Sequence, residues 1–169
     1  MLDFLFPRLT AGRERGTDLF EAITSLARQP HWYVDGEVPD TLDGRFAVLA
    51  SLAALVLVRL ESEGETGNLV SVALTERFIA VMEAEHRELG LGDPTLGKTV
   101  RRLVGSLARR TDLWRAATNG ELDWPAATRE SLYKESVPSA ALDHSAQALD
   151  RLWAKFEATP IAAIEQGKL

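Results

Sequence analysis

The chain has 169 residues, of which 46% are hydrophobic and 26% are charged, and its formal net charge is −6. This balance is typical of one globular domain and unlike that of a disordered chain, and an acidic chain is unlike a non-specific nucleic-acid binder. The chain has no cysteine, which excludes disulfides, thiolate metal sites and cysteine nucleophiles.

The first residues, MLDFLFPRL, are apolar, but Asp3, Pro7 and Arg8 interrupt them before the core of a secretory signal can form. We treat 1–16 as an N-terminal segment in which LDFLF either docks on the protein's own core or lies on a membrane. The longest apolar run, 46–58, is too short to span a bilayer. We therefore expect a cytoplasmic protein, or one that is peripheral to a membrane.

The spacing of apolar residues predicts helices in chain order over 18–28, 42–62, 69–89, 93–117, a segment after 123–125, 139–158 and 160–166. Asp18 and Glu21 have the spacing of a capping box at the first of these helices. The second helix, which Asp40 or Thr41 can cap, is apolar nearly all round and should be central. The third carries an apolar stripe that ends at Leu89 and is predicted to be buried.

Between the helices, 31–41 is expected to be a loop whose aromatic residues tuck into the core, and EGETGN at 63–68 is expected to be a turn. No strand pattern is convincing. The predicted fold class is all-α, a single-domain bundle of about six to seven helices. We place the main helical domain at 17–135, with C-terminal helices at 136–169 packing on the same domain.

The segment Gly92–Thr99 fits the P-loop pattern G-x-x-x-x-G-K-[ST] and raises nucleotide binding as an alternative. A P-loop, however, needs a strand to deliver the loop onto a helix, and here a helix is predicted before Gly92. In the structural interpretation, Gly92 makes a tight turn and Asp93 starts or caps the next helix. Gly97 then lets another helix pack closely.

DTLDGRF at 40–46 and MEAEHRELGLGDPTLGKTVRRL at 82–103 resemble the ubiquinol–cytochrome c chaperone family, whose members assemble respiratory complex III. The resemblance is strong over about 28–105, weakens towards Tyr133 and is absent beyond it. Thr99 departs from the family pattern, which often has a basic residue there.

The resemblance implies a non-enzymatic chaperone that binds newly made cytochrome b. A bacterial member would act at the cytoplasmic face of the inner membrane, with or without a small partner protein. We expect no cofactor and no catalytic residue. The residues assigned to partner binding are Arg87, Glu88, Gly90, Gly92, Asp93, Gly97, Lys98, Arg101 and Arg102. A structural network is assigned to Asp40, Gly44 and Arg45. A helical interaction module with another client stays an alternative.

Charged residues suggest two further features. The first is a basic face on the fourth helix, suited to an anionic membrane surface or an acidic partner, formed by Lys98, Arg101, Arg102 and Arg109 and extended by Arg110 and Arg115. Its plain alternative is a solvated face. The second is an ion-pair network that joins three helices through Arg45, Arg87, Glu88 and Asp93. The histidines, His31, His86 and His144, are scattered and predict no metal site.

Overall fold

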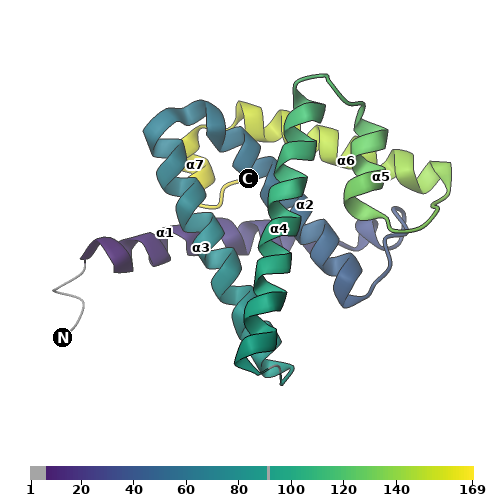
Figure 1. Ribbon diagram of the computed structural model, residues 1–169. Coiled ribbons are helices and arrows are strands. Elements are labelled where there is room, and N and C mark those ends of the chain that lie inside the picture. The colour runs from purple at the N-terminus through teal and green to yellow at the C-terminus, as the bar shows by residue number, and fades with distance from the viewer. Residues whose placement is uncertain (1–6, 91) are drawn as a thin grey trace.

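The computed structural model describes the backbone of residues 7–90 and 92–169, and the side chains of these residues from Arg15 onwards. The segment LDFLF lies outside the described residues. The helices are α1 (Pro7–Ala27), η1 (Pro30–Trp32), α2 (Leu42–Leu60), η2 (Glu61–Glu63), α3 (Gly64–Glu88), α4 (Asp93–Thr118), α5 (Trp124–Leu132), α6 (Ser139–Ala158) and α7 (Ile161–Glu165) (Figure 1). No strand occurs among these residues, which confirms the all-α fold.

Two predicted boundaries are wrong. The first helix begins at Pro7 instead of residue 18, so Asp18 lies within α1 and does not cap it. Proline is well tolerated in the first turn of a helix, and nothing between Pro7 and Asp18 interrupts it. Of the expected turn at 63–68, residues 64–68 are instead the start of α3, and Glu63 is the last residue of η2. Gly67 there is buried and packs so closely that a Cβ at this position would overlap the carbonyl oxygen of Leu60.

Two other helix ends are formed as predicted, and one is not. The side chain of Thr41 caps α2 by accepting a hydrogen bond from the backbone N–H of Gly44, at 3.2 Å. Gly90, with φ 84°, follows α3 in the left-handed conformation. The N-cap of α4 is Gly92, and no side chain caps this helix, so the predicted capping role of Asp93 is wrong.

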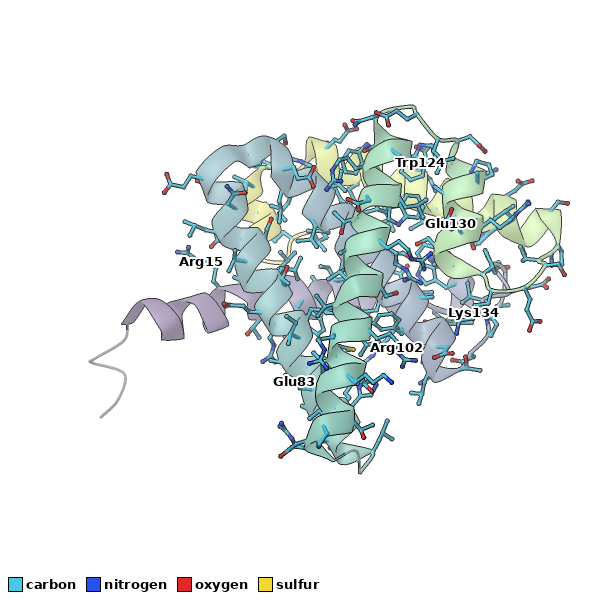
Figure 2. The ribbon with its side chains drawn as sticks, in the orientation of Figure 1. Arg15, Glu83, Arg102, Trp124, Glu130 and Lys134 are labelled. Carbon is cyan, nitrogen blue, oxygen red and sulfur yellow. The ribbon has the colours of Figure 1, made fainter. Side chains whose placement is uncertain are left out.

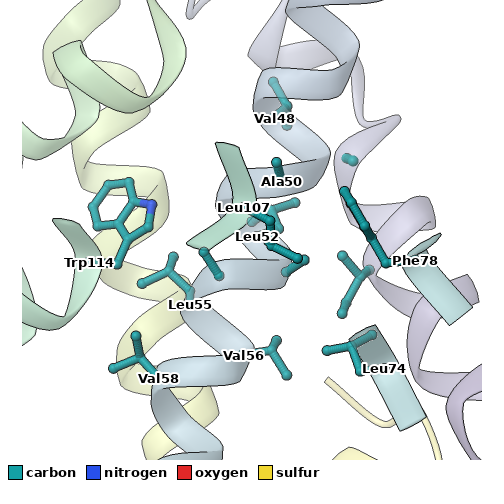
Figure 3. Close-up of a cluster of buried hydrophobic side chains, with 14 of the residues drawn as sticks. Val48, Ala50, Leu52, Leu55, Val56, Val58, Leu74, Phe78, Leu107 and Trp114 are labelled. Carbon is teal, nitrogen blue, oxygen red and sulfur yellow. The ribbon is translucent and has the colours of Figure 1, made fainter. Parts of the chain in front are cut away.

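The core is built around α2, as its composition predicts. Its middle is buried on all sides, and Leu52 and Leu55 are fully inaccessible to solvent. Phe78 of α3 and Trp114 of α4 approach it from different directions (Figure 3). Each fully buried side chain of this size stabilises the fold by roughly 1.5–3 kcal/mol. None of the described helices is long and apolar enough to cross a membrane.

The loop at 31–41 is anchored by its aromatic neighbours. Trp32 is fully buried, as predicted, and its indole N–H donates to the carbonyl of Leu26 at 2.9 Å. From the other side, the hydroxyl of Tyr133 donates to the carbonyl of Gly36 at 2.6 Å. These bonds join the loop to the end of α1 and to the segment after α5.

Candidate functional site

The residues assigned to partner binding gather at one place, the end of the hairpin formed by α3 and α4. The two helices project together beyond the other elements and meet at the lower end of the molecule in Figure 1. We call the described residues of 87–102 the hairpin tip. All of the assigned residues lie on it, and all are exposed except Gly97, which is half-buried: Arg87, Glu88, Gly90, Gly92, Asp93, Gly97, Lys98, Arg101 and Arg102.

An apolar side chain that sequence reasoning misplaced also belongs to the hairpin tip. Leu89 was expected to continue the buried stripe of α3, but it is 64% exposed. The stripe loses its cover because α3 extends past the body of the protein. Leu96, by contrast, is buried and holds the first turns of α4 in place. The hairpin tip therefore presents an exposed leucine beside charged side chains.

The glycines of the hairpin tip are not required by the packing of the described chain. A Cβ on Gly92 would meet nothing within 4 Å, and one on Gly97 would meet only Nη1 of Arg101, at 3.7 Å. The prediction that Gly97 lets another helix of the bundle pack closely is therefore wrong. Gly44 is different, because a Cβ there would overlap the carbonyl oxygen of Pro39. The space beside Gly92 and Gly97 is open.

The predicted ion-pair network between three helices does not form. Arg45 pairs with Asp40 instead, with Nε 2.6 Å from Oδ1, and this hydrogen bond lowers the pKa of the Asp40 carboxyl. In the described part of the chain, no ion pair involves Arg87, Glu88 or Asp93. The charges of the hairpin tip are therefore left exposed to solvent.

The basic face of α4 is shorter than its sequence suggests. Arg109 lies 3.6 Å from Glu130 of α5, and Arg115 forms a 2.6 Å ion pair with Glu61. Arg110 turns inward and is only 7% exposed. Of the six residues predicted to form the basic face, the ones that are exposed and form no ion pair with a described residue are Lys98, Arg101 and Arg102. The basic face is thus confined to the hairpin tip.

The P-loop pattern does not form a phosphate cradle. The helix begins at Asp93, so Gly97 and Lys98 lie inside α4, where backbone N–H groups belong to the helical hydrogen bonds. The N–H of Leu96 already donates to the carbonyl of Gly92, at 2.8 Å. A helix precedes the segment, where a P-loop requires a strand.

A cavity of about 490 Å³ lies between the start of α2, the middle of α4, and the chain from α5 to α6, and it meets the hairpin tip at Arg102. Figure 2 labels Arg102, Glu130 and Lys134, three of the residues around it. Arg110 also lines this cavity. Burial, followed by the repulsion of Arg109, lowers the pKa of Arg110 to about 10, so the guanidinium stays charged at neutral pH.

Two of the histidines are not scattered in space. Nδ1 of His31 lies 3.0 Å from Nε2 of His144, although the two residues are far apart in the chain. No pattern in the sequence signals this contact, because it depends on how α6 packs against the loop after α1. The described residues contain no group of three or more side chains that could hold a metal ion.

The chain is similar to known proteins both in sequence and in fold. A sequence profile described as ubiquinol-cytochrome C chaperone matches residues 34–169, well over half of the chain. The match continues to residue 169, beyond Tyr133, where the resemblance was expected to end. A crystal structure of the Cbp3 homolog from Brucella abortus superposes with a TM-score of 0.78 at 25% identity, over 100% of this chain and 95% of that one. No curated protein sequence matches the chain.

Proposed function

The chain belongs to the ubiquinol-cytochrome C chaperone family, and from this premise we propose that it binds newly made cytochrome b with the hairpin tip. Its role is that of an assembly chaperone of ubiquinol–cytochrome c reductase, respiratory complex III. We propose that it acts by binding alone and catalyses no reaction. The proposed place of action is the cytoplasmic face of the inner membrane, with the protein attached peripherally.

One observation carries the choice of the hairpin tip. Gly92 and Gly97 leave open space beside α4, and no other element of the described fold packs into that space. A helix of a client protein can approach a glycine-bearing helix closely, because no Cβ stands between the two backbones. Leu89, also exposed at the hairpin tip, offers an apolar contact, and Lys98 and Arg101 offer charge.

The cations of the hairpin tip also support a membrane-peripheral position. A client that is a membrane protein emerges beside lipid, and a cluster of basic residues is attracted to an anionic lipid surface. A small partner protein of the kind that the resemblance implies stays a prediction.

Gly97→Ala separates client binding from stability. The added methyl has room, and alanine is the better helix former, so the free energy of unfolding should stay level or rise by about 0.5–1 kcal/mol. If the client packs against Gly97, the amount of cytochrome b that co-purifies with the tagged protein should fall severalfold. Gly105→Ala is the matched control, because Gly105 lies on the same helix in open space and outside the hairpin tip. If the Gly97→Ala protein recovered as much cytochrome b as the wild type does, the proposed contact between the client and Gly97 would be wrong.

A strain that lacks the protein tests the function as a whole. The reduced-minus-oxidised spectrum of its membranes should lose the b-haem signal of complex III, while the cytochrome b transcript stays at its normal level. A normal spectrum with normal complex III activity would contradict the chaperone function itself, whichever surface binds the client. Expression of the Thr99→Lys variant should restore the signal in this strain, since the family pattern that the chain resembles often has a basic residue at this position.

A further inference from the structure

The guanidinium of Arg110 is a buried charge that the described protein leaves without a counter-charge. Its side chain is 7% exposed, and no carboxylate forms an ion pair with it. Its hydrogen-bond partners are neutral: Nη2 donates to the carbonyl of Ser131 at 2.8 Å, and Nη1 donates to the hydroxyl and carbonyl of Ser106. Its Nε–H has no hydrogen-bond partner. A buried charge normally has a partner of opposite sign, because desolvation is costly.

The arginine borders the cavity described above, and the acids around this cavity are engaged elsewhere or stand apart. Asp43 pairs with Lys134 at 2.6 Å, and Glu130 pairs with Arg109. Glu37 and Glu135 are exposed lining residues. Among the described residues that line the cavity, the only buried charge is thus that of Arg110, whereas the exposed lining residues carry both signs.

We propose that this cavity is a binding site for a carboxylate group, which supplies the missing counter-charge of Arg110. A guanidinium fits the planar, two-oxygen geometry of a carboxylate. The exposed acids disfavour a doubly charged phosphate more strongly than a singly charged carboxylate, since like charges repel. This inference does not depend on cytochrome b being the client.

The shape and lining of the cavity define the rest of the ligand. Its volume of about 490 Å³ lies within the range of small-molecule sites in proteins, about 300–1,000 Å³. Phe46 and Leu103 line it beside Arg110, whose Cζ lies 5.7 Å from the centre of the Phe46 ring. The ligand is therefore a carboxylate that carries an apolar group, either as a small molecule or as an acidic side chain in an apolar peptide segment.

The test uses 3-phenylpropanoate and its uncharged amide as probes, and follows binding to the full chain by NMR chemical-shift titration. The acid should bind and the amide should not, in the presence of physiological salt. Phenyl phosphate should bind more weakly than 3-phenylpropanoate. Failure of the acid to bind, equal binding of the amide, or tighter binding of phenyl phosphate would each overturn the proposal.

Variants then assign the binding to one side chain. Arg110→Met keeps the volume but removes the charge, and should weaken binding of the acid about tenfold or more. Arg110→Lys keeps the charge without the planar fork and should give an intermediate affinity. Arg129→Met is the control, because Arg129 is exposed on α5 and does not line the cavity. Unchanged affinity in a folded Arg110→Met protein, checked by circular dichroism, would also overturn the proposal.

The two sources of a carboxylate are separated by a short capped peptide with one glutamate among apolar residues, and by the same peptide with glutamine. If the glutamate peptide binds more tightly than 3-phenylpropanoate, the natural ligand is a polypeptide side chain. If the free acid binds more tightly, the ligand is a small molecule. Both results support the carboxylate site, whereas a glutamine peptide that binds as well as the glutamate peptide contradicts it.

Discussion

At the scale of single residues, the hydroxyls of Ser51 and Ser131 meet in the buried contact between α2 and α5, 2.5 Å apart. Ser51 has one hydroxyl hydrogen, and it donates to the carbonyl of Ala47 at 2.7 Å. The hydroxyl of Ser131 must therefore be the donor between the two serines. The two side chains are chemically alike, but they depend on this contact to different degrees.

This asymmetry predicts unequal effects of the two alanine substitutions. Ser51→Ala leaves the buried Ser131 hydroxyl without its acceptor and should lower the free energy of unfolding by about 1–3 kcal/mol. Ser131→Ala leaves Ser51 bonded to the Ala47 carbonyl, so its effect should be smaller, about 1 kcal/mol or less. Urea denaturation measures both. Equal losses, or a larger loss for Ser131→Ala, would contradict the assigned donor.

His31 predicts a pH dependence of stability. Burial, together with His144 and Arg151, lowers its pKa below 6.5, and Asp35 opposes this shift. Because the unfolded chain then binds a proton more readily than the folded one, this residue's contribution is complete above about pH 6.5 and is lost as the pH falls through the folded-state pKa. His31→Gln should therefore show a shallower loss of unfolding free energy between pH 7.5 and pH 5 than the wild type does. Identical slopes for the two proteins would contradict the prediction.

At the scale of the elements, α1 and α3 pack closely at Gly16. A Cβ at this position would overlap the carbonyl oxygen of Ala73 and lie 2.8 Å from its carbonyl carbon. Since a backbone group of α3 cannot move aside as a flexible side chain can, Gly16→Ala should lower the free energy of unfolding by about 1–3 kcal/mol. Gly105→Ala is the same substitution in open helical space and should raise this free energy by about 0.5–1 kcal/mol. If the Gly16→Ala protein were as stable as the wild type, α1 and α3 would be able to move apart at this contact without a loss of stability, which contradicts the prediction.

The helices could be predicted from the sequence because their signals are local. The apolar middle of α2, the Thr41 cap and the stop at Gly90 each depend on residues close in the chain. The turn predicted at 63–68 is wrong because glycine occurs both in turns and at close contacts between elements. The sequence alone does not distinguish these two uses, since the contacts depend on the packing.

Only part of the candidate site could be predicted, because some of its features depend on packing between elements that are far apart in the chain. Its residues at the hairpin tip form one continuous motif, and the resemblance located them together. The exposure of Leu89 depends on how far α3 projects beyond the body, and the burial of Arg110 depends on α5 covering α4. Periodicity gives the face of a helix that a residue occupies, but not whether another element covers that face.

At the scale of the whole molecule, the net charge of −6 opposes binding to an anionic membrane, so any attraction must come from the local basic face. Replacing Lys98, Arg101 and Arg102 with glutamate should lower the affinity for phosphatidylglycerol vesicles roughly a hundredfold, because each basic residue contributes about 1 kcal/mol of attraction. Flotation with the vesicles measures this affinity. Binding of the wild type should also decrease as salt is raised.

A matched variant controls for the change in total charge. Arg28, Arg129 and Arg151 are also exposed and lie outside the hairpin tip, so replacing these three with glutamate gives the same net charge. This second variant should keep most of the vesicle binding. Equal losses in both triple variants would mean that total charge, and not the hairpin tip, governs the attraction.

The contact between α1 and α7 has a consequence for how the protein is made. Arg15 of α1 forms a 2.7 Å ion pair with Glu165 of α7, and a Cβ on Gly167 would lie 3.0 Å from the carbonyl carbon of Asp18. During translation α1 leaves the ribosome long before α7 is synthesised, and domains fold as units. This part of α1 therefore stays uncovered on the ribosome until late in synthesis. This assembly chaperone is thus itself, until α7 is made, a nascent chain whose first helix lacks one of its covering contacts.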